Sequence, residues 1–187
     1  LLMQMLHPAV LAGVWDHSNF RADMHGRLRR TARFIAKTTY ADRAIAQAAI
    51  DHVRAIHGRV TGRLPDGTSY RADDPALLAW VHVTETTSFL AAWVRYGEPL
   101  MSAADKDRYV ADMAVIGEAM GADPLPRTLA QARAIIQAMR PALRADARTI
   151  EVARLVLGRP SLRARDLPQR LAMEAAIDLL PDWAQRM

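Results

Sequence analysis

Apolar residues recur every three or four positions along almost the whole chain, in segments that Pro and Gly separate at regular intervals. This spacing is typical of helices, and strand-like alternation of apolar and polar residues is rare. Hydrophobic residues make up 51% and charged residues 24% of the 187 positions, a balance typical of a globular protein. The sequence predicts an all-α fold, a single-domain bundle of about seven or eight helices over residues 1–187.

Capping residues and helix breakers predict the boundaries. Asp, Ser or Thr precedes several apolar segments, where it can accept backbone N–H groups, and Gly or Pro follows them. The expected helices cover residues 1–15, 23–37, 41–60, 74–96, 102–120, 128–140, 146–157 and 167–180. Residues 64–70 have turn chemistry that indicates a short hairpin. The segment 74–96 is the most apolar on more than one face, so we expect it at the centre.

The chain begins with an apolar run, Leu1-Leu2-Met3-Gln4-Met5-Leu6, that resembles the middle of a helix. We therefore expect that an N-terminal part of the protein precedes it. No stretch approaches the roughly 20 apolar residues of a membrane-spanning helix, and the expected localisation is cytoplasmic. The chain has no cysteine, which excludes disulfides and thiolate metal ligands, so a metal site must use His, carboxylate or a cofactor.

The net charge of +5 raises the question of a nucleic-acid partner. The only dense basic cluster lies at residues 27–33, and acidic residues are interspersed from Asp42 to Asp182. We expect no nucleic-acid partner, and nucleic-acid binding centred on this cluster remains the weakest hypothesis.

Six histidines, at positions 7, 17, 25, 52, 57 and 82, all fall in the first half of the chain. His57 continues the apolar row of Ile50 and Val53, which predicts that its ring points inward. His52 lies on a neighbouring row, so the two do not form the paired ligands of a two-histidine zinc helix. His82, in the central segment, could meet the third helix as a ligand, as a partner of a ligand, or as a core residue.

Arg27 and Thr31 lie one helical turn apart and share a face, with Arg30 beside them. A solvated basic face accounts for Arg29 and Arg33. It does not account for the absence of Glu from this segment, which a buried anion such as a carboxylate or a propionate would explain.

Short motifs along nearly the whole chain are similar, in order and approximate spacing, to those of the MpaB-type oxygenases and their rubber-oxygenase (latex-clearing protein) relatives. The motifs are His7-Pro8-Ala9-Val10, Gly13-Val14, Asp16-His17-Ser18, Arg27-Leu28-Arg29-Arg30-Thr31, His57-Gly58-Arg59-Val60-Thr61-Gly62, Tyr70-Arg71-Ala72-Asp73-Asp74-Pro75, Leu77-Leu78-Ala79-Trp80-Val81-His82, Tyr96-Gly97 and Leu125-Pro126-Arg127-Thr128.

This resemblance implies an all-helical fold and haem b as the cofactor, because the characterised rubber-cleaving members are haem dioxygenases. His57 matches the histidine that binds the iron on its proximal side, and Arg27 and Thr31 match the motif near the cofactor. Arg30 falls where those enzymes have a lysine that reaches the distal face. Arginine stays protonated and has no free lone pair, so we expect no such iron bond and an open distal site.

The relatives also use a glutamate shortly before the Arg motif as a catalytic base, and no glutamate lies between Leu1 and Arg27. Asp16 is a candidate substitute, and cleavage of polyisoprene is not implied. Five aromatic residues could line an apolar substrate channel, although their helical spacing is also typical of a core: Trp15, Phe20, Trp80, Phe89 and Trp93.

The leading hypothesis is a haem-dependent oxygenase, an oxidoreductase that acts on a hydrophobic small molecule. Its catalytic residues would be Arg27, Arg30 and Thr31, its cofactor-binding residues His57, Arg27, Thr31 and His82, and its metal ligand His57. The alternative is a non-catalytic helical scaffold or regulatory protein of the same fold that lacks haem. The substrate, the product and the oligomeric state do not follow from the sequence.

Overall fold

The computed structural model of the protein describes residues 1–158 and 167–187. The helices in these residues are η1 (Gln4–Leu6), α1 (Pro8–His17), α2 (Met24–Tyr40), α3 (Arg43–His57), α4 (Pro75–Tyr96), α5 (Ala103–Met120), α6 (Leu129–Met139), η2 (Arg140–Ala142), α7 (Ala147–Leu157), α8 (Leu167–Asp178) and α9 (Asp182–Gln185). A small antiparallel hairpin pairs β1 (Thr61–Arg63) with β2 (Ser69–Arg71). The predicted all-α class and the hairpin are confirmed.

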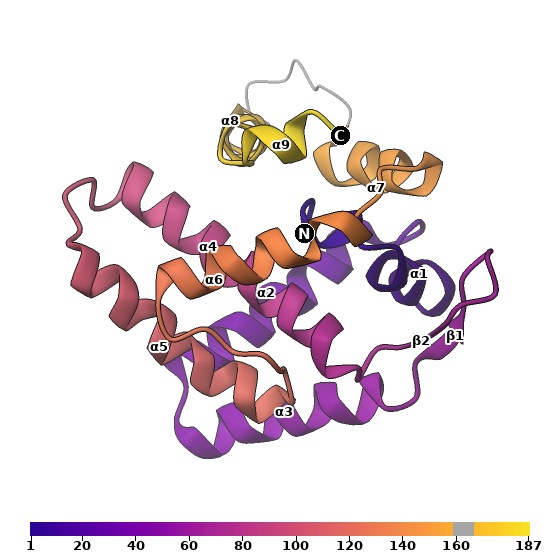
Figure 1. Ribbon diagram of the computed structural model, residues 1–187, viewed down its shortest axis with the longest axis horizontal. Helices are drawn as coiled ribbons and strands as arrows, with labels where there is room; N and C mark the ends of the chain where they lie inside the picture. Colours follow the sequence, from indigo (N-terminus) through magenta and orange to yellow (C-terminus); the bar gives the residue numbers. More distant parts are fainter. Residues whose placement is uncertain (159–166) are drawn as a thin grey trace.

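Helix α4 crosses the middle of the bundle, with α5 and α6 packed along it (Figure 1). Helices α2 and α3 are consecutive, pack against each other and are joined only by Ala41 and Asp42. Helix α1 lies beside the β-hairpin at the right of the view, while α7 to α9 lie together at its top.

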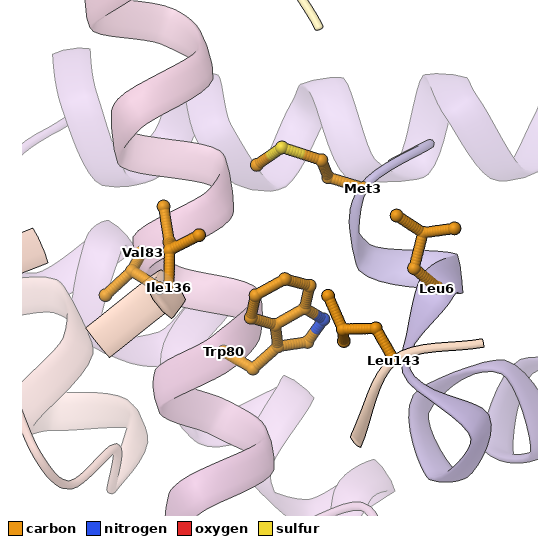
Figure 2. Close-up of a cluster of buried hydrophobic side chains, with 6 residues drawn as sticks. All are labelled: Met3, Leu6, Trp80, Val83, Ile136 and Leu143. Atoms are coloured by element: carbon orange, nitrogen blue, oxygen red, sulfur yellow. The ribbon is translucent and has the colours of Figure 1, made fainter. Parts of the chain in front are cut away.

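The core lies where α4 meets η1, α6 and the segment after η2. Trp80 is completely buried, and its indole Nε1 donates a hydrogen bond to the carbonyl oxygen of Gln4 at 3.2 Å. Apolar side chains surround it (Figure 2): Met3, Leu6, Val83, Ile136 and Leu143. Burial of each such side chain contributes roughly 1.5–3 kcal/mol to folding. The predicted central place of this segment is confirmed.

Most predicted caps are confirmed, because they depend only on local sequence. The side chains of four predicted capping residues accept backbone N–H groups at the starts of α2, α4, α5 and α6: Asp23, Asp74, Ser102 and Thr128. No helix in the described ranges is long and apolar enough to cross a membrane.

Three predicted boundaries are wrong. The helix expected over residues 23–37 continues to Tyr40. The helix expected over residues 1–15 is interrupted at His7, whose backbone is extended before Pro8; proline disfavours a helical conformation in the residue before it. The helix expected over residues 41–60 ends at His57. The Val60 carbonyl accepts a hydrogen bond from the Ala72 N–H, so this residue belongs to the base of the hairpin.

Candidate functional site

His57 is the last residue of α3 and faces the interior. On the same row, Ile50 is buried and Val53 is half-buried, whereas Ile45 and Ile56 on the neighbouring row are 46% and 43% exposed. His57 is half-buried, and His52 is exposed. The predicted inward direction of His57 and the separation of the two histidines are therefore confirmed.

The His57 ring is suited to bind a metal. Its Nδ1 atom is buried and has no hydrogen-bond partner among the described residues. Burial lowers the pKa of His57, and the nearby Asp73 carboxylate opposes that shift only in part. The ring is therefore neutral at neutral pH, which is the form that binds a transition metal.

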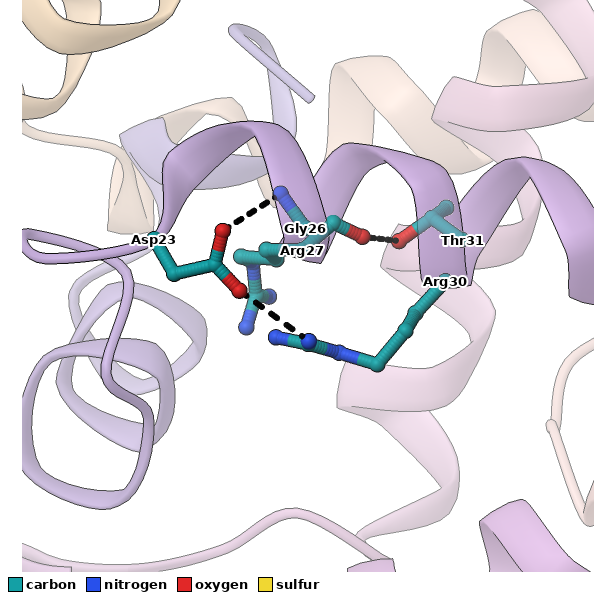
Figure 3. Close-up of polar contacts among 5 residues, drawn as sticks. All are labelled: Asp23, Gly26, Arg27, Arg30 and Thr31. Carbon is teal, nitrogen blue, oxygen red and sulfur yellow. Dashed lines mark hydrogen bonds and ion pairs between the residues drawn. The ribbon is translucent and has the colours of Figure 1, made fainter.

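The predicted Arg motif occupies the start of α2 (Figure 3). Asp23 caps the helix, since its Oδ1 accepts the Gly26 N–H at 2.8 Å, and its Oδ2 lies 3.3 Å from Arg30 Nη1. The Thr31 hydroxyl donates to the Arg27 carbonyl oxygen at 3.2 Å. Arg30 and Thr31 are exposed. The Asp23 carboxylate is thus an acidic partner for Arg30 within the same segment.

Arg27 differs from its neighbours. It is half-buried, and no acidic residue in the described part of the chain forms a salt bridge with it. Burial lowers the pKa of Arg27, and the charge of Arg30 adds to this shift. A half-buried guanidinium without an acidic partner is suited to bind an anionic group.

The α2–α3 pairing relates Arg27 to His57. Arg27 lies in the first turn of α2 and His57 in the last turn of α3, and a helical hairpin places these turns at the same end. None of the residues of α2, all of which the structure describes, is fully buried. Its apolar residues, among them Leu28, Phe34 and Ile35, are only half-buried.

His82 lies on α4 and packs against α5. A Cβ atom on Gly117 would lie 3.1 Å from both Nδ1 and Cε1 of the His82 ring. Burial lowers the pKa of His82 to about 4, and its Nε2 is buried without a partner among the described residues. The structure thus places His82 against α5. Helix α3 reaches the same end of α5, where Arg54 Nη1 donates to the Ala119 carbonyl at 3.3 Å.

Asp16, the candidate substitute for the glutamate, is exposed at the end of α1 and held by the hairpin. Its Oδ2 accepts the Tyr70 hydroxyl at 2.9 Å. Burial and this hydrogen bond raise the pKa of Tyr70 to about 12. The tyrosine therefore stays protonated and continues to donate to Asp16 at neutral pH.

The five aromatic residues do not form one cluster, and the core alternative is confirmed for two of them. Trp80 and Phe20 are buried in two separate apolar clusters, whereas Phe89 and Trp93 are 42% and 56% exposed. A cavity of about 340 Å³ lies elsewhere, among η1, α7, α8 and α9, and no residue of α2, α3 or α4 lines it. Helical spacing predicts which face a residue occupies but not what lies opposite.

Sequence reasoning also missed Thr86, a completely buried residue whose Oγ1 has no partner in the described part of the chain. The one available signal was its place one turn after His82 on the central helix. Within the ranges 1–158 and 167–187, no group of three or more His, Asp or Glu side chains is arranged to hold a metal ion. The donor that His57 offers is a single imidazole, which suits a metal whose other positions a cofactor fills.

Comparison with curated proteins and with solved structures gives no significant match. One family model, described as "ER-bound oxygenase mpaB/B'/Rubber oxygenase, catalytic domain", matches residues 1–187. This match covers the whole chain and agrees with the ordered motifs and the helical fold. The chain therefore belongs to the mpaB and rubber oxygenase catalytic-domain family.

Proposed function

We propose that this chain is a haem b-dependent oxygenase of a hydrophobic small molecule, with His57 as the iron ligand. The observation that carries the proposal is the neutral, half-buried imidazole with a buried nitrogen that lacks a protein partner. A single histidine suffices, because the porphyrin supplies four of the metal's ligands. Bound haem would supply an iron centre that activates dioxygen, a chemistry that protein side chains do not provide.

Arg27, on the other helix of the α2–α3 pair, supports this assignment. Its half-buried guanidinium has no acidic partner in the described residues and lies at the same end as His57. It can bind a haem propionate through charge-assisted hydrogen bonds. The half-buried apolar face of α2 can contact the porphyrin or the substrate and exclude water from both.

The remaining residues have narrower proposed roles. Thr31 and His82 would line the cofactor pocket, and Arg30 would lie at its edge, where it pairs with Asp23 on the protein surface. Asp16 is the proposed proton acceptor, held in place by Tyr70. The oxygenase family and the apolar α2 face favour a hydrophobic substrate.

A haem titration tests this proposal. We expect the wild-type protein to develop a Soret band with about one haem per chain, and His57→Ala to lose most of this affinity. His52→Ala is the matched control, because it removes an exposed imidazole from the same helix. A wild-type protein without a Soret band, or equal titrations of the two variants, contradicts the proposal.

No glutamate lies between Leu1 and Arg27, which favours a second candidate, a non-catalytic scaffold of the same fold. Under this hypothesis His57→Ala changes stability but no ligand spectrum. Oxygen uptake that depends on an added hydrophobic substrate would exclude the scaffold hypothesis.

A further inference from the structure

Helix α4 carries four hydroxyl residues within five positions, and one differs from the other three. The hydroxyls of Thr84, Thr87 and Ser88 donate to the carbonyls of Trp80, Val83 and Thr84 at 2.8, 2.6 and 2.6 Å. This back-bonding within the helix is the usual solution for such residues. Thr86 is completely buried, yet its Oγ1 has no partner in the described residues.

His82 presents a second unpaired polar atom one turn earlier on the same side of α4. Its Nε2 is buried and unpaired among the described residues. The ring packs closely against Gly117 of α5, since a Cβ on that glycine would lie 3.1 Å from two ring atoms. Side chains one turn apart lie about 5–6 Å from each other, so both groups can reach one atom between them.

Two buried groups without partners weaken a fold, because each forfeits its hydrogen bonds to water. Buried groups of this kind are expected at a site where a bound ligand forms the missing hydrogen bonds. With the proton of His82 on Nε2, both groups are neutral hydrogen-bond donors. A ligand that satisfies them must offer an acceptor oxygen or nitrogen.

We propose that His82 and Thr86 form a two-donor site that binds the acceptor atom of a small ligand in the cofactor pocket. This inference rests on the proposed function, and it extends that function by naming the donors that hold an oxygen-bearing or nitrogen-bearing ligand. Arg54, one turn before His57 on α3, donates to the Ala119 carbonyl, and His82 packs against Gly117 two residues earlier, so these parts of α3 and α4 both approach the end of α5.

The first test is the thermal stability of the haem-free protein. Thr86→Val keeps the shape of the side chain and removes the unpaired hydroxyl, so we expect Tm to rise by about 2–4 °C. Thr87→Val is the matched control and should not raise Tm, because it removes a hydroxyl that is already bonded to Val83. A lower Tm for Thr86→Val would show that its hydroxyl is already paired, which would overturn the inference.

The second test is cyanide binding to the ferric, haem-loaded protein, with cyanide as the nitrogen acceptor. We expect Thr86→Val and His82→Leu to weaken binding by about tenfold, the loss of roughly one hydrogen bond. Thr87→Val should bind like the wild type, and Thr86→Ser, which keeps a hydroxyl, should recover most of the affinity.

The outcomes separate the two proposals. If the wild type takes up no haem, the proposed function fails and this inference fails with it. If haem uptake is normal but Thr86→Val binds cyanide as tightly as Thr87→Val, the inference alone is overturned. Thr86→Val is close to isosteric, so this comparison holds even where His82→Leu does not fold.

Discussion

Helices α4 and α2 are both long, but the protein buries them to very different extents. Helix α4 has seven buried residues, including the completely buried Trp80 and Val83. Helix α2, which the structure describes in full, has none, and it packs chiefly on α3. Since a helix in a protein is stabilised mainly by burial of its apolar face, α2 has a face that the described protein covers only in part.

The cluster around Trp80 and the α2–α3 hairpin also differ in whether their polar groups have hydrogen-bond partners within the protein. At the core, Trp80 Nε1 donates to Gln4, and the Thr84 hydroxyl donates to Trp80. At the end of the α2–α3 hairpin, Arg27 has no acidic partner and His57 Nδ1 has no hydrogen bond among the described residues. The cluster around Trp80 thus satisfies its polar groups within the protein, whereas the α2–α3 hairpin, like His82 and Thr86 on α4, leaves polar groups without a partner among the described residues.

The largest expected effect comes from the core. Trp80→Ala should lower the free energy of unfolding by about 3–5 kcal/mol, because it leaves a cavity and removes the hydrogen bond from the indole to the Gln4 carbonyl. Urea denaturation measures this change. Trp93→Ala, at a 56% exposed position of the same helix, is the control and should change stability by about 0.5 kcal/mol or less. Equal costs for the two variants would contradict the assignment of the core.

The second effect is the pH dependence of stability. Burial lowers the pKa of His82 to about 4 in the folded state, below its ordinary value of 6.5. Between these values the unfolded chain binds a proton that the folded protein does not, so stability should fall as pH decreases from 6.5 to 4. The expected loss is about 2–3 kcal/mol.

Urea denaturation at several pH values measures this loss, and the lowered pKa of His57 acts in the same direction. His82→Gln removes the titrating group and should flatten the profile. An unchanged slope in this variant would show that His82 is not the group responsible.

The third effect should have the opposite sign. Arg27→Met keeps the apolar stem and removes a half-buried charge, so we expect the haem-free protein to gain about 1 kcal/mol of stability. Haem affinity should fall by about tenfold, the loss of roughly one charge-assisted hydrogen bond. Arg29→Met, at an exposed position of the same helix, should alter neither quantity. A destabilised Arg27→Met protein would identify this arginine as part of the fold.

The smallest effect is expected at the start of α2. Asp23→Asn keeps a side chain that can cap α2 but removes the charge that pairs with the exposed Arg30. Because such exposed pairs contribute little, the urea midpoint at neutral pH should stay within error of the wild type. A clear decrease would show that the pair helps to hold the start of α2.

Local chemistry made much of the fold predictable. Asp74 and Pro75 predicted the start of α4, and Gly97 its end, because capping and helix breaking depend on neighbouring residues. The row of Ile50, Val53 and His57 predicted that the His57 ring points inward, because the face that a helical residue occupies also depends only on its local spacing. Pro8 carried a comparable signal for the break after η1, which the apolar run around it obscured.

What the sequence could not predict depends on contacts between distant elements. Val60 leaves α3 because it pairs with Ala72 in the hairpin, and Phe89 is exposed because no described element covers that side of α4. Thr86 escaped notice because the direction of its hydroxyl depends on the side-chain rotamer, whereas periodicity predicts only the face that a residue occupies.

The most direct test of the account is the Soret spectrum of haem-loaded His57→Gly, measured with and without added imidazole. This variant removes the ring and leaves space for a free imidazole in its place. The account predicts that the band is weak or shifted alone and returns to its wild-type position when imidazole is added. A wild-type spectrum without imidazole, or no response to it, would contradict His57 as the iron ligand.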